Sequence, residues 1–159
     1  MSQEAEIVLT PRGRIKLEQK LEHLRGVQRR EVADRIRDSK QFGDLTENAE
    51  YEEAKIEQAL VEGQIAEIRH VLQLAQTLDE ADIPTDHIGI GSIVKMTNLD
   101  DDDEWELTLV SSVEADPDND LVSDESPVGE GLFGKKVGDV VKIEVPNGTI
   151  KYRVDSIRK

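Results

Sequence analysis

Two long amphipathic helical stretches, separated at one glycine, constrain the fold of this chain more than any other feature of its sequence. In residues 12–42 and again in residues 45–78, apolar side chains recur at spacings of three and four, which places them on one face of a helix. The apolar positions are Leu17, Leu21, Leu24, Val32 and Ile36 in the first stretch and Ile56, Leu60, Ile65, Ile68, Leu72 and Ala75 in the second. Thr10 and Pro11 are typical of an N-cap and a first helical position, and Gly43 interrupts the pattern between the stretches. We expect an antiparallel hairpin, a rod whose arms of about 30 residues each span roughly 45 Å.

The two arms carry opposite net charge. Residues 12–40 contain ten Lys or Arg residues and five acids, a net charge of +5, whereas residues 44–82 contain eleven acids and two bases, a net charge of −9. Such arms attract each other along their length and disfavour pairing between like arms. Because the hairpin can satisfy itself, we expect a monomer.

Beyond a linker at residues 82–90, the apolar period changes from helical spacing to alternation. The sequence predicts strands at residues 92–96, 104–110, 139–145 and 149–157, and a short helix within residues 126–133. The last two strands flank Asn147-Gly148, a dipeptide that favours a type I′ hairpin turn. We therefore predict an α+β fold with two domains, a helical hairpin at residues 1–83 and a β-rich domain at residues 84–159.

The composition excludes several classes of protein. The net charge is −15 over 159 residues, so phosphate backbones would repel the chain and little direct DNA binding is expected. There is no cysteine, and hence no disulfide framework, and His23, His70 and His87 stand apart from any set of metal ligands. The N-terminus does not resemble a signal peptide, and no apolar run approaches the roughly 18 residues that would span a bilayer. We expect a soluble cytoplasmic protein with no membrane partner.

The turn between the helices, at about residues 42–51, contains the residues most suggestive of chemistry. Asp44 and Glu47 are three residues apart at the start of the second helix, so both carboxylates can point beyond the end of the rod. The same spacing fits a capping box, in which Asp44 is the N-cap and Glu47 the third helical residue. Spacing by itself leaves both interpretations open.

The amino-acid sequence of the whole turn resembles a motif of a known protein family. Residues 43–51, Gly-Asp-Leu-Thr-Glu-Asn-Ala-Glu-Tyr, followed by Ala54 and Lys55, closely resemble the tip signature of the GreA/GreB transcript-cleavage factors. Further matching motifs occur in the same order at residues 9–13, 62–65, 126–127, 131–135 and 137–140, so that the resemblance covers nearly the whole chain.

The resemblance implies both a fold and a mechanism. It implies a coiled-coil hairpin followed by a domain similar to FKBP-type prolyl isomerases. It also implies a factor that docks at the secondary channel of bacterial RNA polymerase and stimulates cleavage of backtracked nascent RNA by the polymerase itself. By match to the motif, Asp44 and Glu47 help to hold a second Mg²⁺ in the polymerase active centre. Together with the Mg²⁺ that polymerase already holds, this ion would complete the pair that two-metal hydrolysis needs. The factor alone would not be an enzyme and would bind no cofactor tightly.

Other matching positions receive supporting roles by the same resemblance. Lys40 and Lys55 would contact the RNA 3′ end, and an interpretation of both as ordinary solvated lysines stays open. Gly43, Asn48 and Tyr51 would support the tip, and Tyr51 would either stack on a base or brace the hairpin. Glu125, Ser126 and Pro127 would dock to polymerase. Alternatively, the Ser-Pro pair would simply start a helix.

Two alternative functions are compatible with this reasoning. A Gre-like protein that occupies the channel and inhibits polymerase would have the same fold, but the intact pair of Asp44 and Glu47 favours cleavage. An FKBP-like prolyl isomerase or chaperone would need an aromatic pocket, and aromatic residues make up only 3% of the chain.

Overall fold

The structure, a computed structural model, describes residues 7–40 and 49–159. By their contacts the residues separate into two compact units. The helical unit comprises Arg14–Leu74, and the sheet unit comprises Met1–Gly13 together with Ala75–Lys159. The chain is therefore of the predicted α+β class. The predicted domain boundary after residue 83 stays a prediction, and the contacts group residues 75–83 and the N-terminal segment with the sheet.

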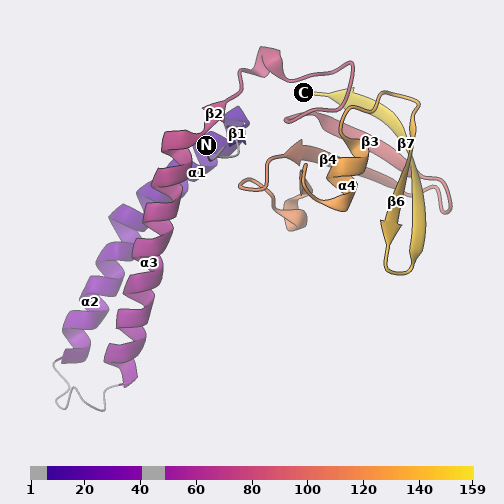
Figure 1. The fold of residues 1–159 in the computed structure, drawn as a ribbon. Coiled ribbons are helices and arrows are strands. Elements are labelled where there is room, and N and C mark those ends of the chain that lie inside the picture. Colours follow the sequence, from indigo (N-terminus) through magenta and orange to yellow (C-terminus); the bar gives the residue numbers. More distant parts are fainter. Residues whose placement is uncertain (1–6, 41–48) are drawn as a thin grey trace, which may run out of the picture. The chain divides into compact units, whose positions relative to one another are not determined.

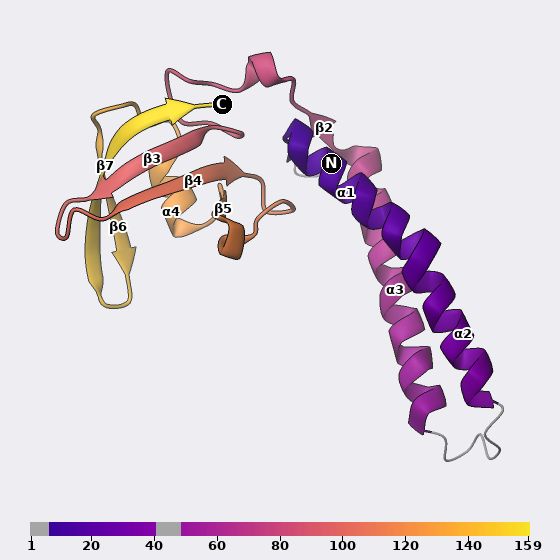
Figure 2. The same ribbon diagram turned by 180° about the vertical axis from the view of Figure 1, so that it is seen from behind.

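The helical unit is a hairpin of two long arms that lie side by side in both views (Figures 1 and 2). The first arm consists of α1 (Pro11–His23), the π-helical segment η1 (Leu24–Gln28) and α2 (Arg29–Lys40), and the second arm is α3 (Ala49–Leu74). The backbone N–H of Gly13 donates to Thr10 Oγ1 at 3.1 Å. This bond confirms Thr10 as the N-cap of a helix that begins at Pro11.

The first arm is not the uninterrupted α-helix that the sequence predicts. Leu24 and Val32 are eight residues apart, a spacing that rotates the second side chain about 80° around an ideal α-helix. The wider turn at η1 between them removes most of this rotation, so that Leu24 and Val32 both lie buried in the hairpin core. The π-helical segment thus keeps one apolar stripe continuous along the arm.

The hairpin core confirms most of the predicted stripes. The buried residues are Leu24, Val32, Val61, Ile65 and Ile68, with Leu17, Leu21, Ile36 and Leu72 packed around them. The prediction for Ile56 and Leu60 was wrong, because these side chains are 63% and 62% exposed. Ala54 and Val61 are buried instead, since residues 54, 61, 65 and 68 keep the spacing of three, four and seven and residues 56 and 60 do not.

The second arm ends at Leu74, four residues before the predicted end. Beyond it β2 (Gln76–Thr77) pairs in parallel with β1 (Val8–Leu9). Gln76 N–H donates to the carbonyl of Ile7 at 2.8 Å, and Leu78 N–H donates to the carbonyl of Leu9 at 2.9 Å. Gln76 and Leu78 thus donate their amide protons to another segment rather than to the preceding helical turn, so α3 cannot continue through them.

Within the described residues, the rest of the sheet unit is built on a five-stranded sheet with the order β5-β4-β3-β7-β6. The strands are β3 (Ile93–Asn98), β4 (Glu104–Val110), β5 (Leu121–Ser123), β6 (Val140–Val145) and β7 (Gly148–Arg158). All pairs are antiparallel except β4 with β5. Four strands correspond to predicted ones within two residues at each end, and β5 was missed because it is short and lacks a clear alternation. Two short 3₁₀ turns, η2 (Glu80–Asp82) and η3 (Pro117–Asn119), lie in the connections.

One face of the sheet is packed against α4 (Pro127–Leu132), the short helix predicted within residues 126–133. The core of this unit comprises Ile88, Val94, Met96, Leu107, Leu109, Leu132, Val141, Ile143 and Val154. A Cβ built on Gly129 would lie 1.9 Å from the carbonyl oxygen of Ser123. Only glycine therefore lets α4 lie so close to the backbone at the end of β5.

The turn between β6 and β7 differs from the predicted type. Val145 is paired with Gly148, so the two residues of the turn are Pro146 and Asn147 rather than Asn147 and Gly148. Of these residues only Gly148 has a positive φ, of 137°. Proline fixes φ near −65°, which excludes the positive φ that a type I′ turn needs at that position.

Candidate functional site

The tip of the hairpin contains the acidic pair of the predicted site. Gly43, Asp44, Glu47 and Asn48 lie outside the described residues, so their roles stay predictions. The description ends on one arm at Lys40, the last residue of α2, and resumes on the other arm at Ala49, the first residue of α3. These two helix ends are the described residues next to the predicted site in the sequence.

Tyr51 and Lys40 meet at this end of the hairpin. Lys40 Nζ lies 6.0 Å from the centroid of the Tyr51 ring, at the outer limit of a cation–π contact. Tyr51 is half-buried and Lys40 is exposed. The contact joins the last turn of α2 to the first turn of α3, so Tyr51 has a partner within the chain that fits the bracing role. A role in stacking on a base stays a prediction.

Lys55 lies about one helical turn further along α3 and is exposed. Its ammonium group donates to Gln58 Oε1 at 3.3 Å. Within the described residues, no carboxylate forms an ion pair with Lys40 or Lys55. An RNA contact at these ammonium groups would therefore break no ion pair among the described residues.

The opposite charges of the two arms form ion pairs along the rod. Arg29 binds Glu62 through two bonds, Nε to Oε1 at 2.8 Å and Nη2 to Oε2 at 2.9 Å, and Arg35 binds Glu57. The hydrogen bond from Arg29 lowers the pKa of Glu62. Both pairs are exposed, so they contribute little to stability. They agree with the predicted attraction between the arms, and they show that Arg29 lies opposite Glu62 and Arg35 opposite Glu57.

The predicted docking residues Glu125, Ser126 and Pro127 lie at the start of α4. Ser126 Oγ accepts the N–H of Gly129 at 3.1 Å and donates to the carbonyl of Ser123 at 2.6 Å. Ser126 is therefore the N-cap of α4, as the helix-start interpretation predicts. Glu125 and Pro127, on either side of it, are exposed, so the capped turn presents both to solvent.

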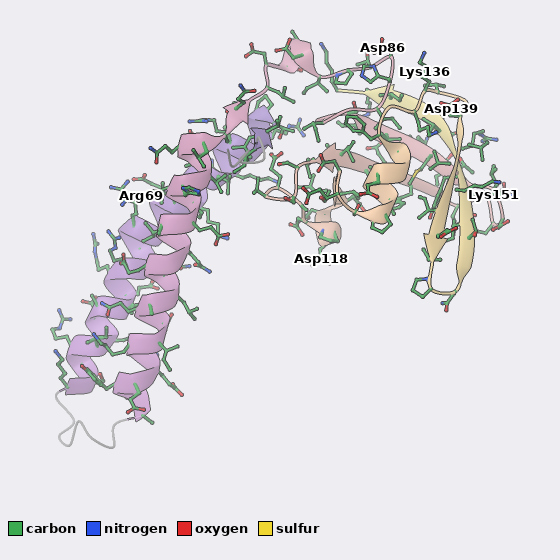
Figure 3. The ribbon with its side chains drawn as sticks, in the orientation of Figure 1. Arg69, Asp86, Asp118, Lys136, Asp139 and Lys151 are labelled. Carbon is green, nitrogen blue, oxygen red and sulfur yellow. The ribbon has the colours of Figure 1, made fainter. Side chains whose placement is uncertain are left out.

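The connection from α4 to β6 forms a second exposed feature of the sheet unit. Lys136 and Asp139 lie on it (Figure 3), and Lys136 N–H donates to Asp139 Oδ2 at 2.8 Å. Phe133 and Val137 on the same connection are 55% and 56% exposed. The sequence analysis assigned no role to these apolar side chains.

Trp105 and Tyr152, the other aromatic residues of the sheet unit besides Phe133, pack against the core and lie 6.0 Å apart between ring centroids. In the described part of the chain, no group of three or more His, Cys, Asp or Glu side chains is arranged to hold a metal ion. Nor does any helix within those ranges combine the length and apolarity needed to cross a bilayer.

Comparison with known proteins identifies the family. Residues 7–77 match the family model described as transcription elongation factor, N-terminal, and residues 83–159 match the model described as transcription elongation factor, GreA/GreB, C-term.

Individual relatives agree with the family models. The chain is 50% identical to transcription elongation factor GreA of Acetivibrio thermocellus over 159 residues, covering 100% of both chains. It is 51% identical to transcription elongation factor GreA of Thermoanaerobacter pseudethanolicus over 153 residues, 96% of this chain and 98% of the relative. Among solved structures, GreA factor homolog 1 of Thermus thermophilus has 29% identity, with a TM-score of 0.45 and coverage of 97% of this chain and 99% of the other. With two family models that together span nearly its whole length, the chain belongs to the GreA/GreB family of transcription elongation factors.

Proposed function

We propose that this protein binds bacterial RNA polymerase in the cytoplasm and stimulates the polymerase to cleave backtracked nascent RNA, which releases arrested complexes. The observation that carries the proposal is the match over 100% of both chains to a transcription elongation factor GreA. The helical hairpin adds support, because α2 and α3 carry the two sides of the acidic tip on a rod that has its own core.

The proposed roles are divided between the tip and the sheet unit. Asp44 and Glu47 are the proposed carboxylates at the polymerase active centre, where they would help to hold a second Mg²⁺ shared with polymerase. Two carboxylates suit that ion, since Mg²⁺ is commonly bound by one or two carboxylates together with waters and phosphate oxygens. When bound, it would activate water and stabilise the leaving oxygen. The factor itself would then be an accessory protein without catalytic activity of its own.

Charge supports the assignment of the remaining contacts. Lys40 and Lys55 are exposed beside the tip and would hold the extruded RNA 3′ end as point charges. Glu125 and Pro127 are exposed on the turn that Ser126 caps, and would contact the rim of the channel. A net charge of −15 makes a basic protein surface a better partner for the whole molecule than nucleic acid.

A cleavage assay tests the proposal. Purified protein and Mg²⁺ are added to backtracked elongation complexes with labelled RNA, and the products are separated on a gel. We expect shortened RNA to appear much faster than with polymerase alone, and no cleavage of free RNA by the factor alone. Binding to polymerase with slower cleavage than the basal rate would instead identify a channel-binding inhibitor.

A further inference from the structure

The outer face of α3 exposes apolar side chains that the hairpin does not use. Ile56 and Leu60 are 63% and 62% exposed, and Ala59 beside them is also exposed. Both large side chains belong to a helix whose other face supplies the hairpin core. Ile56 and Leu60 lie in adjacent helical turns, and they are the most exposed of the large apolar side chains that the structure describes.

Helical spacing places these residues on one side of α3. Residues 56, 60 and 63 are separated by four and three positions, so they share a face, and the buried residues Val61 and Ile65 lie on the opposite face. We call Ile56, Ala59, Leu60 and Gly63 the outer stripe. The first arm packs against the buried face of α3, so the hairpin leaves the outer stripe uncovered.

Gly63 is the second observation on this face. A Cβ built on Gly63 would meet nothing within 4 Å. A glycine inside a helix costs stability relative to alanine, and nothing in the described hairpin requires it. Its absent side chain would matter to a surface that approaches α3 from outside, because that surface could come close to the helix backbone.

The charges around the outer stripe identify the kind of surface that fits it. Glu52 and Glu53 lie one turn before Ile56, and Glu67 lies one turn after Gly63, all exposed. Lys55, next to Ile56, is exposed as well, so the charged side chains around the stripe are mostly but not all acidic. A nucleic acid would be repelled by these carboxylates. A second copy of α3 would bring the same acids against each other. An apolar protein surface rimmed by Lys and Arg would satisfy both the stripe and its acidic ends.

We propose that the outer stripe of α3 is a contact face of the hairpin on RNA polymerase, seated on an apolar patch with a basic rim. The inference rests on the proposed function, which brings the hairpin into contact with polymerase, and adds which of its faces makes the contact. The stripe begins at the residue after Lys55 and runs along α3 away from the tip, and its role is separate from that of Asp44 and Glu47.

The first test truncates the stripe in the full-length protein. The double variant Ile56→Ala/Leu60→Ala should weaken binding to polymerase core enzyme at least about tenfold, because each truncation removes apolar area that binding would bury. Binding is measured by competition against a fluorescently labelled unmodified protein. The melting temperature should stay close to that of the unmodified protein, because both side chains are exposed. The matched control is Ile15→Ala, on the first arm at 54% exposure, which should bind normally.

The second test adds a methyl group at Gly63. Gly63→Ala should raise the melting temperature, since alanine is the better helix former and nothing in the chain blocks it. It should also weaken binding severalfold, because the methyl group keeps the polymerase surface away from the helix. Gly26→Ala is the control, since Gly26 also has nothing within 4 Å of a built Cβ but lies on the other arm. A loss of stability would not account for weaker binding by a more stable variant.

The outcomes separate this inference from the proposed function. If the unmodified protein binds and stimulates cleavage, and the double variant does so with unchanged affinity, the outer stripe is not the contact face and the proposed function stands. Equal losses in Ile15→Ala and in the double variant would also overturn the inference. If the unmodified protein neither binds nor stimulates cleavage, both are overturned. A dimer of the unmodified protein that Ile56→Ala/Leu60→Ala dissolves would assign the stripe to a second copy of the chain.

Discussion

Single residues in this chain show how capping and function compete for the same side chains. Thr10 and Ser126 are both N-caps, and each accepts a backbone N–H three residues ahead at 3.1 Å. Capping is thus an ordinary use of a polar residue at a helix start in this protein. For Ser126 it leaves the neighbours Glu125 and Pro127 exposed. The residue-level question for Asp44 is whether its carboxylate caps the second helix, binds the second Mg²⁺, or does both.

Amide substitutions separate the two roles of the acidic pair. Asn caps helices about as well as Asp, so Asp44→Asn would preserve any cap while it removes the charge. Glu47→Gln removes the charge of the second acid. Each variant should abolish stimulated cleavage, because a neutral amide replaces a carboxylate proposed to hold the second Mg²⁺. Gel analysis of labelled RNA from backtracked complexes gives the rate.

Melting temperature and polymerase affinity are the controls for these amide variants and should change little. Full cleavage by Asp44→Asn would contradict the metal-binding role and support the capping interpretation.

At the scale of elements, irregular positions in the sheet and the helices have identifiable causes. The register of β3 against β7 shifts between Lys95 and Met96, whose partners are Ser156 and Val154, so Asp155 is the extra residue of a β-bulge. Its carboxylate accepts from Thr97 Oγ1 and from Arg153 Nε. The bulge thus directs the Asp155 carboxylate toward Thr97, which is buried. In the first arm, the irregular segment η1 likewise changes which way side chains point, since it keeps Leu24 and Val32 on the same buried face.

The bulge predicts a dependence of stability on pH. The hydrogen bond from Thr97, followed by that from Arg153, lowers the pKa of Asp155. A lowered pKa in the folded state stabilises the protein above the ordinary pKa, and this contribution is lost as the pH falls through the lowered value. Asp155→Asn should therefore be less stable than the unmodified protein by about 1 kcal/mol near pH 7. The difference should shrink below about pH 4.

Urea unfolding at a series of pH values measures this difference. A gap between Asp155→Asn and the unmodified protein that stays constant down to pH 2 would contradict the role of the charge.

The start of the first helix is held by an acid from a distant loop of the sheet unit. Glu114 accepts the N–H of Thr10 at 3.2 Å and its hydroxyl at 2.7 Å. A Cβ on Gly13 would lie 1.1 Å from Glu114 Oε1, so Gly13→Ala must displace the carboxylate. We expect Glu114→Ala to cost about 1–2 kcal/mol. Gly13→Ala should cost less, because the end of a flexible side chain can move aside and alanine is the better helix former.

The Gly13–Glu114 contact also predicts that the two losses are not additive. Because both changes break the same contact, the double variant should be no less stable than Glu114→Ala alone, which a double-mutant cycle from urea unfolding measures. Additive losses would show that the two residues act independently.

At the scale of the molecule, the chain has two units with separate cores, and the proposed function gives each unit a different role. The helical unit has an apolar core between its arms, and the sheet unit has its own core beneath α4. Each can hold its site without residues from the other core. The proposal gives the tip to the first unit and docking to the second, so loss of one should affect affinity and chemistry differently.

Removal of the sheet domain tests this division. A fragment of residues 1–83 keeps every buried residue of the hairpin core and should remain helical by circular dichroism. It should bind polymerase at least about 100-fold more weakly than the full chain, because the linked second contact is gone. Competition against labelled full-length protein measures this. Full affinity in the fragment would place the docking surface on the hairpin alone.

Much of the fold follows from local patterns in the sequence. The N-cap at Thr10, the strand at Glu104–Val110 and the helix after Ser126 were predicted because each depends on neighbouring residues alone. The exposure of Ile56 and Leu60 could not be predicted in this way. An isolated helix gives them the same periodicity as core residues, and only the position of the other arm decides which face is buried.

The sequence by itself determined the two classes of structure, the family and the acidic pair proposed for the tip, because periodicity and motif are properties of residues close together in the chain. Only the tertiary structure decided that α3 ends at Leu74, that Glu114 binds Thr10 and that the outer stripe of α3 is uncovered. Each of these features depends on which segment, distant in sequence, packs nearby and accepts a hydrogen bond or covers an apolar face. The spacing of residues along one segment does not specify which distant segment will pack against it.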